Sequence, residues 1–277
     1  MQKFSILTAL FNSGNYLDNY FKTIFSQNIL PNEIVLIDDG ENPKDLNNFI
    51  NSIKKIYNFQ NIILIKNKRN IGLGPSLNIG LKKSSNNLIF RLDVDDAWLP
   101  NHTQKMMSLY KKDQNYLIYA ESLKYSNLRN FIKCDDFLIN ENSTIHSSWL
   151  INKNIFMDFR YHLINPKIAL EDYFTLFWHQ YHGYKLKISY DQITTIYNDT
   201  PGSLGKKYAN NFYYLKNRKK ISNFILLHNL KKRRNFFSKI YFILFQFNLI
   251  RIIIFYFWIQ DIFKVKKIYY RFKMLYN

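Results

Sequence analysis

Three aspartates, Asp93, Asp95 and Asp96, stand within four residues, directly after the apolar run 88–92. Carboxylates this close repel one another, so such a group usually needs a cation or a hydrogen-bond network to hold it. Hard oxygen ligands suit Mg²⁺ or Mn²⁺, which keep open positions for substrate phosphates. An ordinary acidic surface loop explains a D-x-D triplet about as often. The apolar run before the triplet and the helix entry Trp98-Leu99-Pro100 behind it favour a metal site.

Two further acidic pairs stand at predicted element boundaries. Asp38-Asp39 follows the short apolar run 33–37, where an Asp-Gly turn is the alternative to a binding role. Glu171-Asp172 opens a predicted helix. Acidic residues in a first turn complement the helix dipole, whereas a carboxylate that faces a site can act as a general base. The pattern alone favours the helix-dipole interpretation.

The elements around these residues alternate between strand and helix. Strands are predicted at 4–11, 33–37, 62–66 and 88–92, and helices at 16–27, 45–57, 70–83 and 100–112. Such alternation with short connections predicts an α/β fold with a largely parallel sheet. Ligands of such sheets bind beyond the carboxyl ends of the strands, where both 38–39 and 93–96 fall. The later chain is expected to hold a strand near 116–120, loops at 130–143, a helix at 170–182 and a helical region at 206–277.

Positive charge is concentrated in the C-terminal quarter of the chain. The net charge is +19, and residues 206–277 carry 17 Lys and Arg residues against one acid, Asp261. We therefore expect a catalytic domain at 1–205 and a basic, aromatic, helical extension at 206–277. The apolar stretch 236–259 is interrupted by Lys239 and Arg251, which is typical of a helix that lies on an anionic membrane surface. A helix packed on the catalytic domain is the alternative.

The N-terminus and the cysteine usage bear on the compartment. Residues 1–7 are too short an apolar stretch for a secretory signal, and the single Cys134 cannot form an internal disulfide. We expect a protein of the reducing cytoplasm, peripheral at the inner face of the cytoplasmic membrane. His146 and His179 show no metal-ligand spacing and are expected to be structural or surface residues.

Four segments match a known family in order and in spacing. They are 4–12 (FSILTALFN), 33–40 (EIVLIDDG), 70–81 (NIGLGPSLNIGL) and 91–100 (RLDVDDAWLP). With them the chain resembles family 2 glycosyltransferases of the GT-A fold, especially the bacterial subgroup that builds capsule, lipopolysaccharide and exopolysaccharide. The resemblance runs from Phe4 to about Ser203. It implies a nucleotide-diphospho-sugar transferase with a Rossmann-like, mostly parallel sheet flanked by helices.

The resemblance also implies roles for the matching residues. Asp39 would accept a hydrogen bond from the uracil imide, and Asp95 would be the principal metal ligand, with Asp93 and Asp96 beside it. The divalent metal, Mn²⁺ or Mg²⁺, would neutralise the leaving diphosphate. The implied nucleotide-sugar-binding residues are Ala9, Asn12, Asp38, Asp39, Arg69, Asn70, Gly72, Asn78 and Asp93.

The Glu-Asp motif of the family matches Glu171-Asp172, which makes Asp172 the implied catalytic base. It would deprotonate an acceptor hydroxyl, and a single displacement would invert the anomeric configuration. The expected donor is a UDP-hexose or UDP-N-acetylhexosamine, and the expected acceptor is a glycan or a polyprenyl-diphosphate-linked molecule. The chain departs from the family at Ala9, where many relatives carry Pro, and at 197–203, where many carry an Arg- and His-bearing motif. The second departure leaves the acceptor open.

Two other functions stand as alternatives. A nucleotidyltransferase would share the sheet and the metal carboxylates, but it would need a glycine-rich, basic phosphate loop. Residues 8–15 hold one glycine and no base. A nucleic-acid-binding protein would use the basic extension, but it would leave the acidic groups at 38–39 and 93–96 unexplained, since acids repel phosphate. No nucleic-acid partner is therefore expected.

Overall fold

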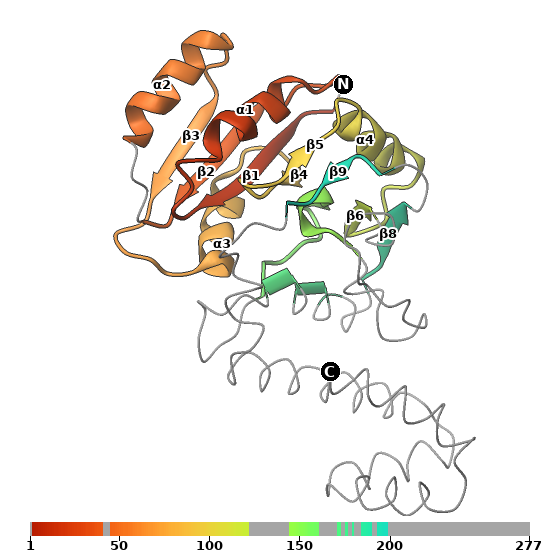
Figure 1. The fold of residues 1–277 in the computed structure, drawn as a ribbon. Helices are drawn as coiled ribbons and strands as arrows, with labels where there is room; N and C mark the ends of the chain where they lie inside the picture. Colours follow the sequence, from red (N-terminus) through yellow and green to blue (C-terminus); the bar gives the residue numbers. More distant parts are fainter. Residues whose placement is uncertain are drawn as a thin grey trace, which may run out of the picture. The chain divides into compact units, whose positions relative to one another are not determined.

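The computed structural model describes residues 2–40, 45–121, 144–160, 171–172, 175–176, 179, 184–189 and 193–198. Over the first half of this part of the chain, strands and helices alternate as the sequence predicts (Figure 1). The loops expected at 130–143 and the basic extension expected at 206–277 lie outside the described residues. The division into a catalytic domain and an extension therefore stays a prediction.

A seven-stranded sheet forms the centre of the described structure, in the order β3-β2-β1-β4-β7-β6-β8. Its first four strands along the chain are β1 (Phe4–Leu10), β2 (Glu33–Asp38), β3 (Ile62–Lys66) and β4 (Leu88–Arg91). Each neighbouring pair among these four strands is parallel. Because parallel strands end at the same edge of a sheet, the residues that follow β1, β2 and β4 gather there. The predicted α/β fold with a largely parallel sheet is confirmed for the described residues.

The other half of the sheet departs from the predicted pattern. It consists of β6 (Ile118–Glu121), β7 (Leu150–Asn152) and β8 (Leu186–Ser189). β7 runs antiparallel to both β4 and β6, whereas β6 and β8 are parallel. The sequence analysis predicts β6 but neither β7 nor β8. β7 has only three residues, and β8 mixes Leu and Ile with Lys and Ser, so neither forms an apolar run that marks a strand.

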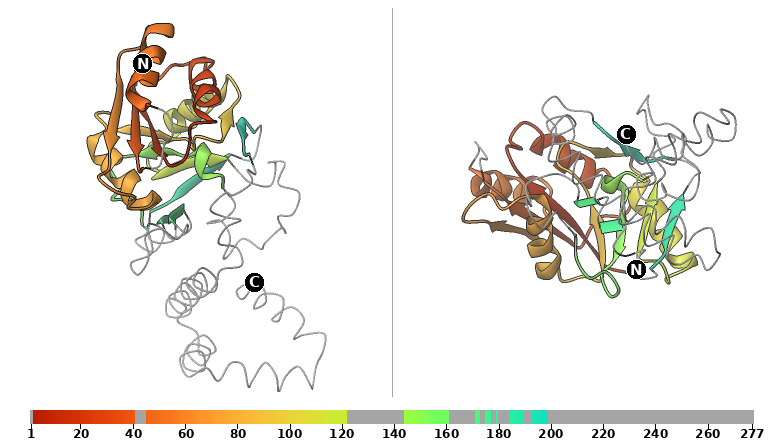
Figure 2. Two further views of the ribbon diagram at one scale, coloured as in Figure 1. Left: turned by 60° about the vertical axis from the view of Figure 1, so that its left-hand side comes forward. Right: turned by 90° about the horizontal axis from the view of Figure 1, so that it is seen from below.

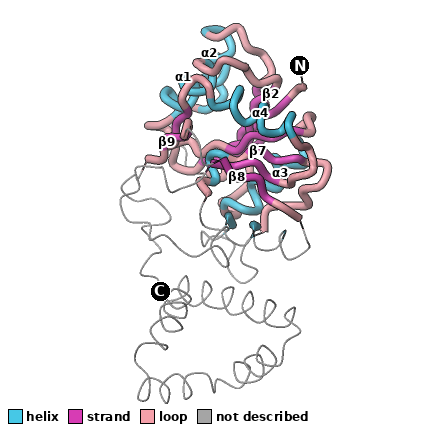
Figure 3. The backbone as a smooth tube through the Cα atoms, turned by 90° about the vertical axis from the view of Figure 1, so that its right-hand side faces the viewer, coloured by secondary structure: helices cyan, strands magenta, loops and turns pink. Residues whose placement is uncertain are grey.

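Successive side chains of a strand point to opposite faces, which divides the core into two layers. Ile6 and Phe90 belong to the layer with helices α1 (Leu17–Phe25), α2 (Leu46–Ile56) and α4 (His102–Lys112). Leu7 and Ile89 belong to the layer with α3 (Leu73–Lys83). Accordingly, α1 and α2 lie on one side of the sheet and α3 on the other (Figures 2 and 3). Burial of both faces explains why these strands are nearly continuous apolar runs.

Helix α3 packs directly on the sheet because Gly80 has no side chain. A Cβ added at Gly80 would lie 2.3 Å from the Cδ1 atoms of both Leu7 and Ile37. At the start of the same helix, Gly72 has a φ of 95°, a conformation that favours glycine. Gly72 thus permits the backbone turn into α3, and Gly80 permits the close packing of the helix on β1 and β2.

A small second sheet pairs β5 (Ala97–Trp98) with β9 (Thr195–Ile196) in antiparallel fashion. The sequence analysis predicts neither strand, because two residues show no periodicity. The pairing matters for the site, since it brings the residues after β9 next to the residues before β5.

The described residues between 171 and 179 are helical, which confirms the helix predicted at 170–182 for those positions. They are Glu171, Asp172, Thr175, Leu176 and His179. Among the helices that the structure describes, none has the length and hydropathy that crossing a bilayer requires.

Candidate functional site

The three clustered aspartates follow β4 at the carboxyl edge of the sheet. Carboxylate oxygens of Asp93, Asp95 and Asp96 all lie within 4.8 Å of one another. Asp93 and Asp95 are partly exposed, whereas Asp96 is buried. The backbone turns tightly here, since the Asp96 N–H donates to the carbonyl of Asp93 at 3.2 Å. The fold therefore brings together the three carboxylates that the sequence analysis assigned to a metal.

Asp96 is fixed from two distant segments. Its Oδ2 accepts a short hydrogen bond from the Ser147 hydroxyl, and its Oδ1 accepts one from the Asn198 backbone N–H at 2.9 Å. Asn198 comes two residues after β9, so the small sheet supplies this second contact. Burial, and then the charge of Asp93, raise the pKa of Asp96 to about 8. A nearby cation would favour the ionised form of this carboxyl group and so lower its pKa.

Asp93 is paired with Arg91 and lies beside His146. Its Oδ1 lies 3.0 Å from Nη1 of Arg91, and its Oδ2 lies 3.3 Å from Nδ1 of His146. Burial opposes ionisation of Asp93, but the charge of Arg91 and the hydrogen bonds from Arg91 and Ser147 outweigh it and hold its pKa below the usual range. Asp93 is therefore the anionic member of the cluster that the protein itself neutralises.

Arg91 joins the acidic cluster to the predicted catalytic segment. Its Nη2 lies 3.4 Å from Oε1 of Glu171, and both side chains are buried. Burial and the neighbouring Asp172 carboxylate raise the pKa of Glu171 to about 8, against the opposing charge of Arg91. The charge of the neighbouring Asp172 helps to raise the pKa of Arg91 and opposes the lowering of the pKa of His146.

Two histidines have different outcomes. His179 is buried, donates from Nδ1 to the carbonyl of Thr175 and accepts from the N–H of Met157, so the predicted structural role is confirmed. His146 also lies 3.8 Å from Oε1 of Glu171, so it stands between two acidic residues of the site. Burial and the charge of Arg91 lower its pKa, although the nearby aspartates oppose this. The sequence predicted a structural or surface role for His146 and gave no sign of its position between Asp93 and Glu171.

The sequence analysis missed the residues that hold the acidic cluster. They are Arg91, His146, Ser147 and Asn198. Three of them come from segments far along the chain, where no motif marks them. Arg91 is the exception, since a charged residue that ends an apolar strand needs a buried partner.

Asp39 organises the loop before α3. Its Oδ1 accepts from the Asn67 amide at 2.8 Å and from the Ile71 N–H at 2.9 Å, and its Oδ2 accepts from the Gly72 N–H at 2.8 Å. The side chain is buried. The Asp39 N–H donates to the carbonyl of Leu10, which ties β2 to the end of β1. Asp39 thus fixes the loop that the resemblance places below the nucleotide.

The remaining predicted donor residues lie at or near this edge of the sheet. Ala9 is level with Ile37 near the ends of β1 and β2, and Asp38 caps Gly40 through a 3.1 Å bond to its N–H. Asn12, Arg69 and Asn70 are at least partly exposed in the connecting loops. The roles of these residues toward a donor stay predictions.

Asn78 has a structural role that the sequence analysis did not include. Its amide donates to the carbonyl of Phe159 at 2.7 Å and accepts from the N–H of Phe159 at 2.7 Å. This pair of bonds clamps α3 to the segment that follows β7. A contact of Asn78 with the sugar nucleotide would have to use the amide hydrogen and the oxygen lone pair that do not bind Phe159.

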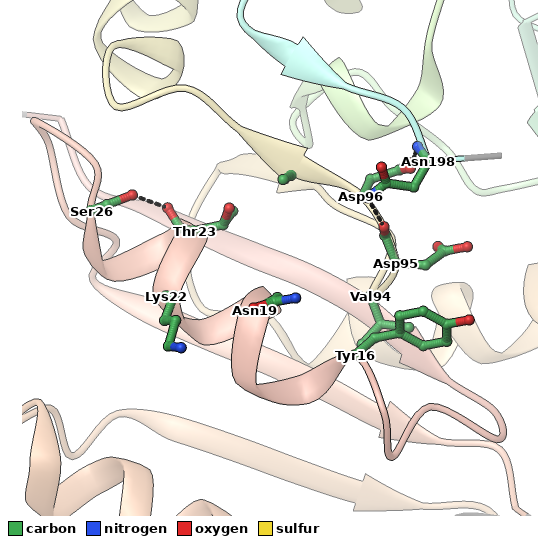
Figure 4. Close-up of a pocket in the computed structure, with 10 residues that line it drawn as sticks. Tyr16, Asn19, Lys22, Thr23, Ser26, Val94, Asp95, Asp96 and Asn198 are labelled. Carbon is green, nitrogen blue, oxygen red and sulfur yellow. Dashed lines mark hydrogen bonds between the residues drawn. The ribbon is translucent and has the colours of Figure 1, made fainter. Parts of the chain in front are cut away.

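A groove of about 650 Å³ opens beside the acidic cluster (Figure 4). Tyr16, Asn19 and Lys22 line it from α1 and the residue before that helix, and Asp95, Asp96 and Asn198 line it from the opposite side. Asp95 and Asp96 of the acidic cluster therefore form part of the wall of this groove.

Curated relatives are similar to part of this chain. The UDP-Gal:alpha-D-GlcNAc-diphosphoundecaprenol beta-1,3-galactosyltransferase of Escherichia coli is 30% identical over 113 residues, which cover 40% of each chain. The amylovoran biosynthesis glycosyltransferase AmsE of Erwinia amylovora is 30% identical over 107 residues, which cover 38% of this chain and 39% of that protein. The matched stretch thus spans about two fifths of the length of these relatives.

Solved structures show the same fold at low sequence identity. The structure of S. aureus TarS 1-349 in complex with UDP-GlcNAc is similar with a TM-score of 0.64 and 13% identity, covering 84% of this chain and 68% of that chain. The mannosyltransferase PcManGT from Pyrobaculum calidifontis, in complex with GDP-Man and Mn²⁺, is similar with a TM-score of 0.59 and 13% identity, covering 84% and 64%. These likenesses support the expected GT-A fold.

The family comparison covers the acidic cluster and the Glu-Asp motif together. The model described as glycosyl transferase family 2 matches residues 5–172, from the first strand to the predicted base, which is more than half of the chain. On this match, and with the site geometry above, the chain belongs to glycosyl transferase family 2.

Proposed function

We propose that this chain is an inverting glycosyltransferase that transfers a sugar from a UDP-sugar to a glycan or a polyprenyl-diphosphate-linked acceptor in bacterial surface polysaccharide synthesis. One observation carries the proposal. In a family 2 chain, the acidic cluster Asp93, Asp95 and Asp96 is joined through Arg91 to the segment that bears Asp172. This link supports a cation site for the leaving group and a base for the acceptor in the same part of the fold.

The edge near Asp39 supports a uridine nucleotide. A carboxylate can accept about four hydrogen bonds, and Asp39 already accepts three. The remaining capacity on Oδ2 suits an imide N–H. Phe11 follows β1 directly and is 42% exposed, so its ring offers a face on which a planar base can stack. UDP-GlcNAc in the TarS complex and UDP-Gal in the name of the Escherichia coli relative agree with this donor class.

The acidic cluster fits a divalent cation. Its oxygens converge within 4.8 Å, and carboxylate oxygens are the donors that Mg²⁺ and Mn²⁺ prefer. Asp95 would be the main ligand, because Asp93 is paired with Arg91 and Asp96 is held by Ser147 and Asn198. When bound, the cation would neutralise charge on the departing diphosphate. The Mn²⁺ in the PcManGT complex agrees with this assignment.

The side chains of this chain then perform the transfer as a single displacement. The Asp172 carboxylate takes the proton of an acceptor hydroxyl, and the resulting oxygen attacks the anomeric carbon. The bond from that carbon to the diphosphate breaks on the opposite side, and the electron pair leaves with the nucleoside diphosphate. The configuration at the anomeric carbon is therefore inverted. Asp172 is partly exposed, as a base that meets a substrate must be.

The acceptor and the location are inferred from the relatives and from charge. The name of the Escherichia coli relative includes a diphosphoundecaprenol acceptor. Residues 206–277, with 17 Lys and Arg residues and one acid, suit contact with the anionic inner face of the cytoplasmic membrane. The proposed location is thus peripheral to that membrane, and the proposed catalytic domain is 1–205. Binding to vesicles that contain anionic lipid, but not to neutral vesicles or to nucleic acid, is the expected result.

The decisive experiment is a donor-hydrolysis screen with the purified full chain. UDP-, GDP- and dTDP-sugars are compared with added Mn²⁺, with added Mg²⁺ and with a chelator. The expected result is turnover of one or more UDP-sugars that the chelator abolishes and Mn²⁺ or Mg²⁺ restores. Turnover that is indifferent to the chelator would refute the cation assignment, and no turnover of any sugar nucleotide would refute the proposed function.

A further inference from the structure

The guanidinium of Arg91 is enclosed between two acidic side chains from distant segments. Arg91 is 1% exposed, yet it is a cation, and a buried charge is strongly destabilising unless it is paired. Nη1 lies 3.0 Å from Asp93, and Nη2 lies 3.4 Å from Glu171. The two carboxylates are 78 residues apart in sequence. One planar group therefore spans two parts of the fold.

This arrangement depends on the shape of arginine as well as on its charge. The guanidinium presents several N–H donors in a rigid, planar fork, whereas lysine presents a compact point charge on a flexible stem. Arg91 ends β4, which is hydrogen-bonded to β1 on one side and to β7 on the other. The fork therefore projects from one of the most firmly held positions in the sheet.

Glu171 and Asp172 face different surroundings, because neighbouring residues on a helix point about 100° apart. Glu171 is 4% exposed and faces Arg91, whereas Asp172 is partly exposed. Anchoring Glu171 thus fixes the rotation and depth of the helical segment that carries Asp172. The same guanidinium holds Asp93, next to Asp95 in the cluster.

We propose that Arg91 is a positioning residue, whose fork sets the distance between the acidic cluster and the Asp172 carboxylate. It acts through Asp93 and Glu171 and does not touch the substrate, since it is buried. This inference rests on the proposed function, because it takes Asp172 as the base. The alternative is that Arg91 only neutralises charge in the core, in which case its loss lowers stability and leaves the chemistry of the folded molecules unchanged.

Three variants separate these two roles. Arg91→Lys keeps the positive charge but loses the planar fork. Glu171→Ala removes the oxygen atoms that accept the hydrogen bond from Arg91, whereas Glu171→Gln keeps one such oxygen. Glu33→Ala is the matched control, since Glu33 is also a buried carboxylate but binds Ser5 and Ser85 at the opposite end of the sheet. Each variant is measured for the kcat and KM of UDP-sugar hydrolysis, for Mn²⁺ binding by electron paramagnetic resonance, and for Tm.

The expected result is a fall in kcat without a matching change in the KM for the donor or in Mn²⁺ affinity. Arg91→Lys and Glu171→Ala should each lose at least about tenfold in kcat, as a base displaced by part of an ångström does. Their KM for the donor and their Mn²⁺ affinity should stay within about twofold of wild type, and Glu171→Gln should recover most of the kcat. The double variant Arg91→Lys/Glu171→Ala should be no slower than the slower single variant, because both changes break one link.

Two results would overturn the inference while the proposed function stands. One is an active wild type whose Glu171→Ala variant keeps full kcat. The other is Glu33→Ala losing as much kcat as Glu171→Ala at a similar Tm. If Arg91→Lys does not fold, the Glu171 pair and the control decide the matter alone. A wild type without turnover of any UDP-sugar would instead overturn the proposed function, and this inference with it.

Discussion

The Oδ2 atom of Asp39 accepts a hydrogen bond from the backbone N–H of Gly72 at 2.8 Å, which joins the end of β2 to the start of α3. The bond spans 33 residues of sequence and is buried. It converts a flexible, glycine-containing loop into a fixed rim at the carboxyl edge of the sheet. The proposed nucleotide site therefore depends on a carboxylate that also shapes the backbone around it.

Replacing Asp39 with Asn should weaken both the loop and nucleotide binding. One of the Asp39 oxygens becomes an NH₂ group that faces a backbone N–H, so the free energy of unfolding should fall by about 1–3 kcal/mol. UDP binding in the presence of Mn²⁺, measured by titration calorimetry, should weaken as well. Asp45→Asn is the control, since Asp45 caps α2 through the N–H groups of Asn47 and Asn48, and Asn also serves as a cap. Equal effects in the two variants would contradict the special role of Asp39.

Two glycines of the α3 region should give contrasting variants. Gly72→Ala places a side chain at a φ of 95°, which should cost about 1–3 kcal/mol and displace the loop that Asp39 holds. Gly80→Ala forces a methyl group against Leu7 and Ile37, which should cost about 1–3 kcal/mol through overpacking. Only Gly72→Ala should weaken UDP binding at a temperature where both variants are folded. If Gly80→Ala weakens UDP binding as much, the loop is not the sensitive element.

Asp95 and Asp172 should fail in different ways. Asp95→Ala should lose Mn²⁺-dependent UDP binding together with turnover, because Asp95 is the main proposed metal ligand. Asp172→Asn should keep that binding and lose at least about a hundredfold in kcat, the usual contribution of a general base. Calorimetry and steady-state kinetics on the same samples test both statements. An Asp172→Asn chain with full kcat would show that another group accepts the proton.

The burial of His102 predicts a loss of stability in mild acid. Its ring stacks on Trp98 at 4.5 Å and is fully buried, and this burial lowers its pKa to about 4. The unfolded chain takes up the proton near pH 6.5, so the unfolded state binds more protons between the two pKa values. The free energy of unfolding should therefore decrease as the pH falls from about 6.5 to about 4, by about 3 kcal/mol in total.

The groups around His102 define the control for this measurement. Glu121 lies 3.9 Å from the ring and is paired with Lys105 at 3.0 Å. Burial raises the pKa of Glu121, but the hydrogen bonds from Thr194 and Lys105 and the charge of Lys105 outweigh it, so the pKa is lowered. Its protonation thus removes further stability at lower pH. Urea unfolding of wild type and His102→Gln between about pH 7 and about pH 5 separates the two groups, and parallel curves would rule out His102 as the cause.

The first half of the fold was readable from the sequence because its elements are long and strongly patterned. β1, β2 and β4 are buried on both faces, and the apolar runs of β2 and β4 lead to Asp38 and Asp93, which mark the carboxyl edge directly. The acidic cluster was found for the same reason. The strands β5, β7 and β9 were missed because two or three residues carry no periodicity, and β8 was missed because its Lys and Ser interrupt an apolar run.

The parts of the site that the sequence did not reveal are long-range contacts. Ser147 and Asn198 reach Asp96 from 51 and 102 residues away, and no local pattern records such a meeting. His146 follows no metal-ligand spacing, and only the antiparallel placement of β7 brings it to Asp93. Asn78 was assigned to the donor by motif alone, whereas its amide is engaged with the backbone of Phe159.

The pairing of Arg91 with both Asp93 and Glu171 also bears on the order in which the molecule assembles. Asp93 is available to Arg91 as soon as β4 forms, but Glu171 lies 80 residues downstream. A chain that emerges from the ribosome therefore holds the Arg91 guanidinium without its second partner until the later segment docks. Such non-local closure is slow compared with local helix formation. A product truncated before Glu171 would therefore lack this link to Arg91, and β8 and β9 with it.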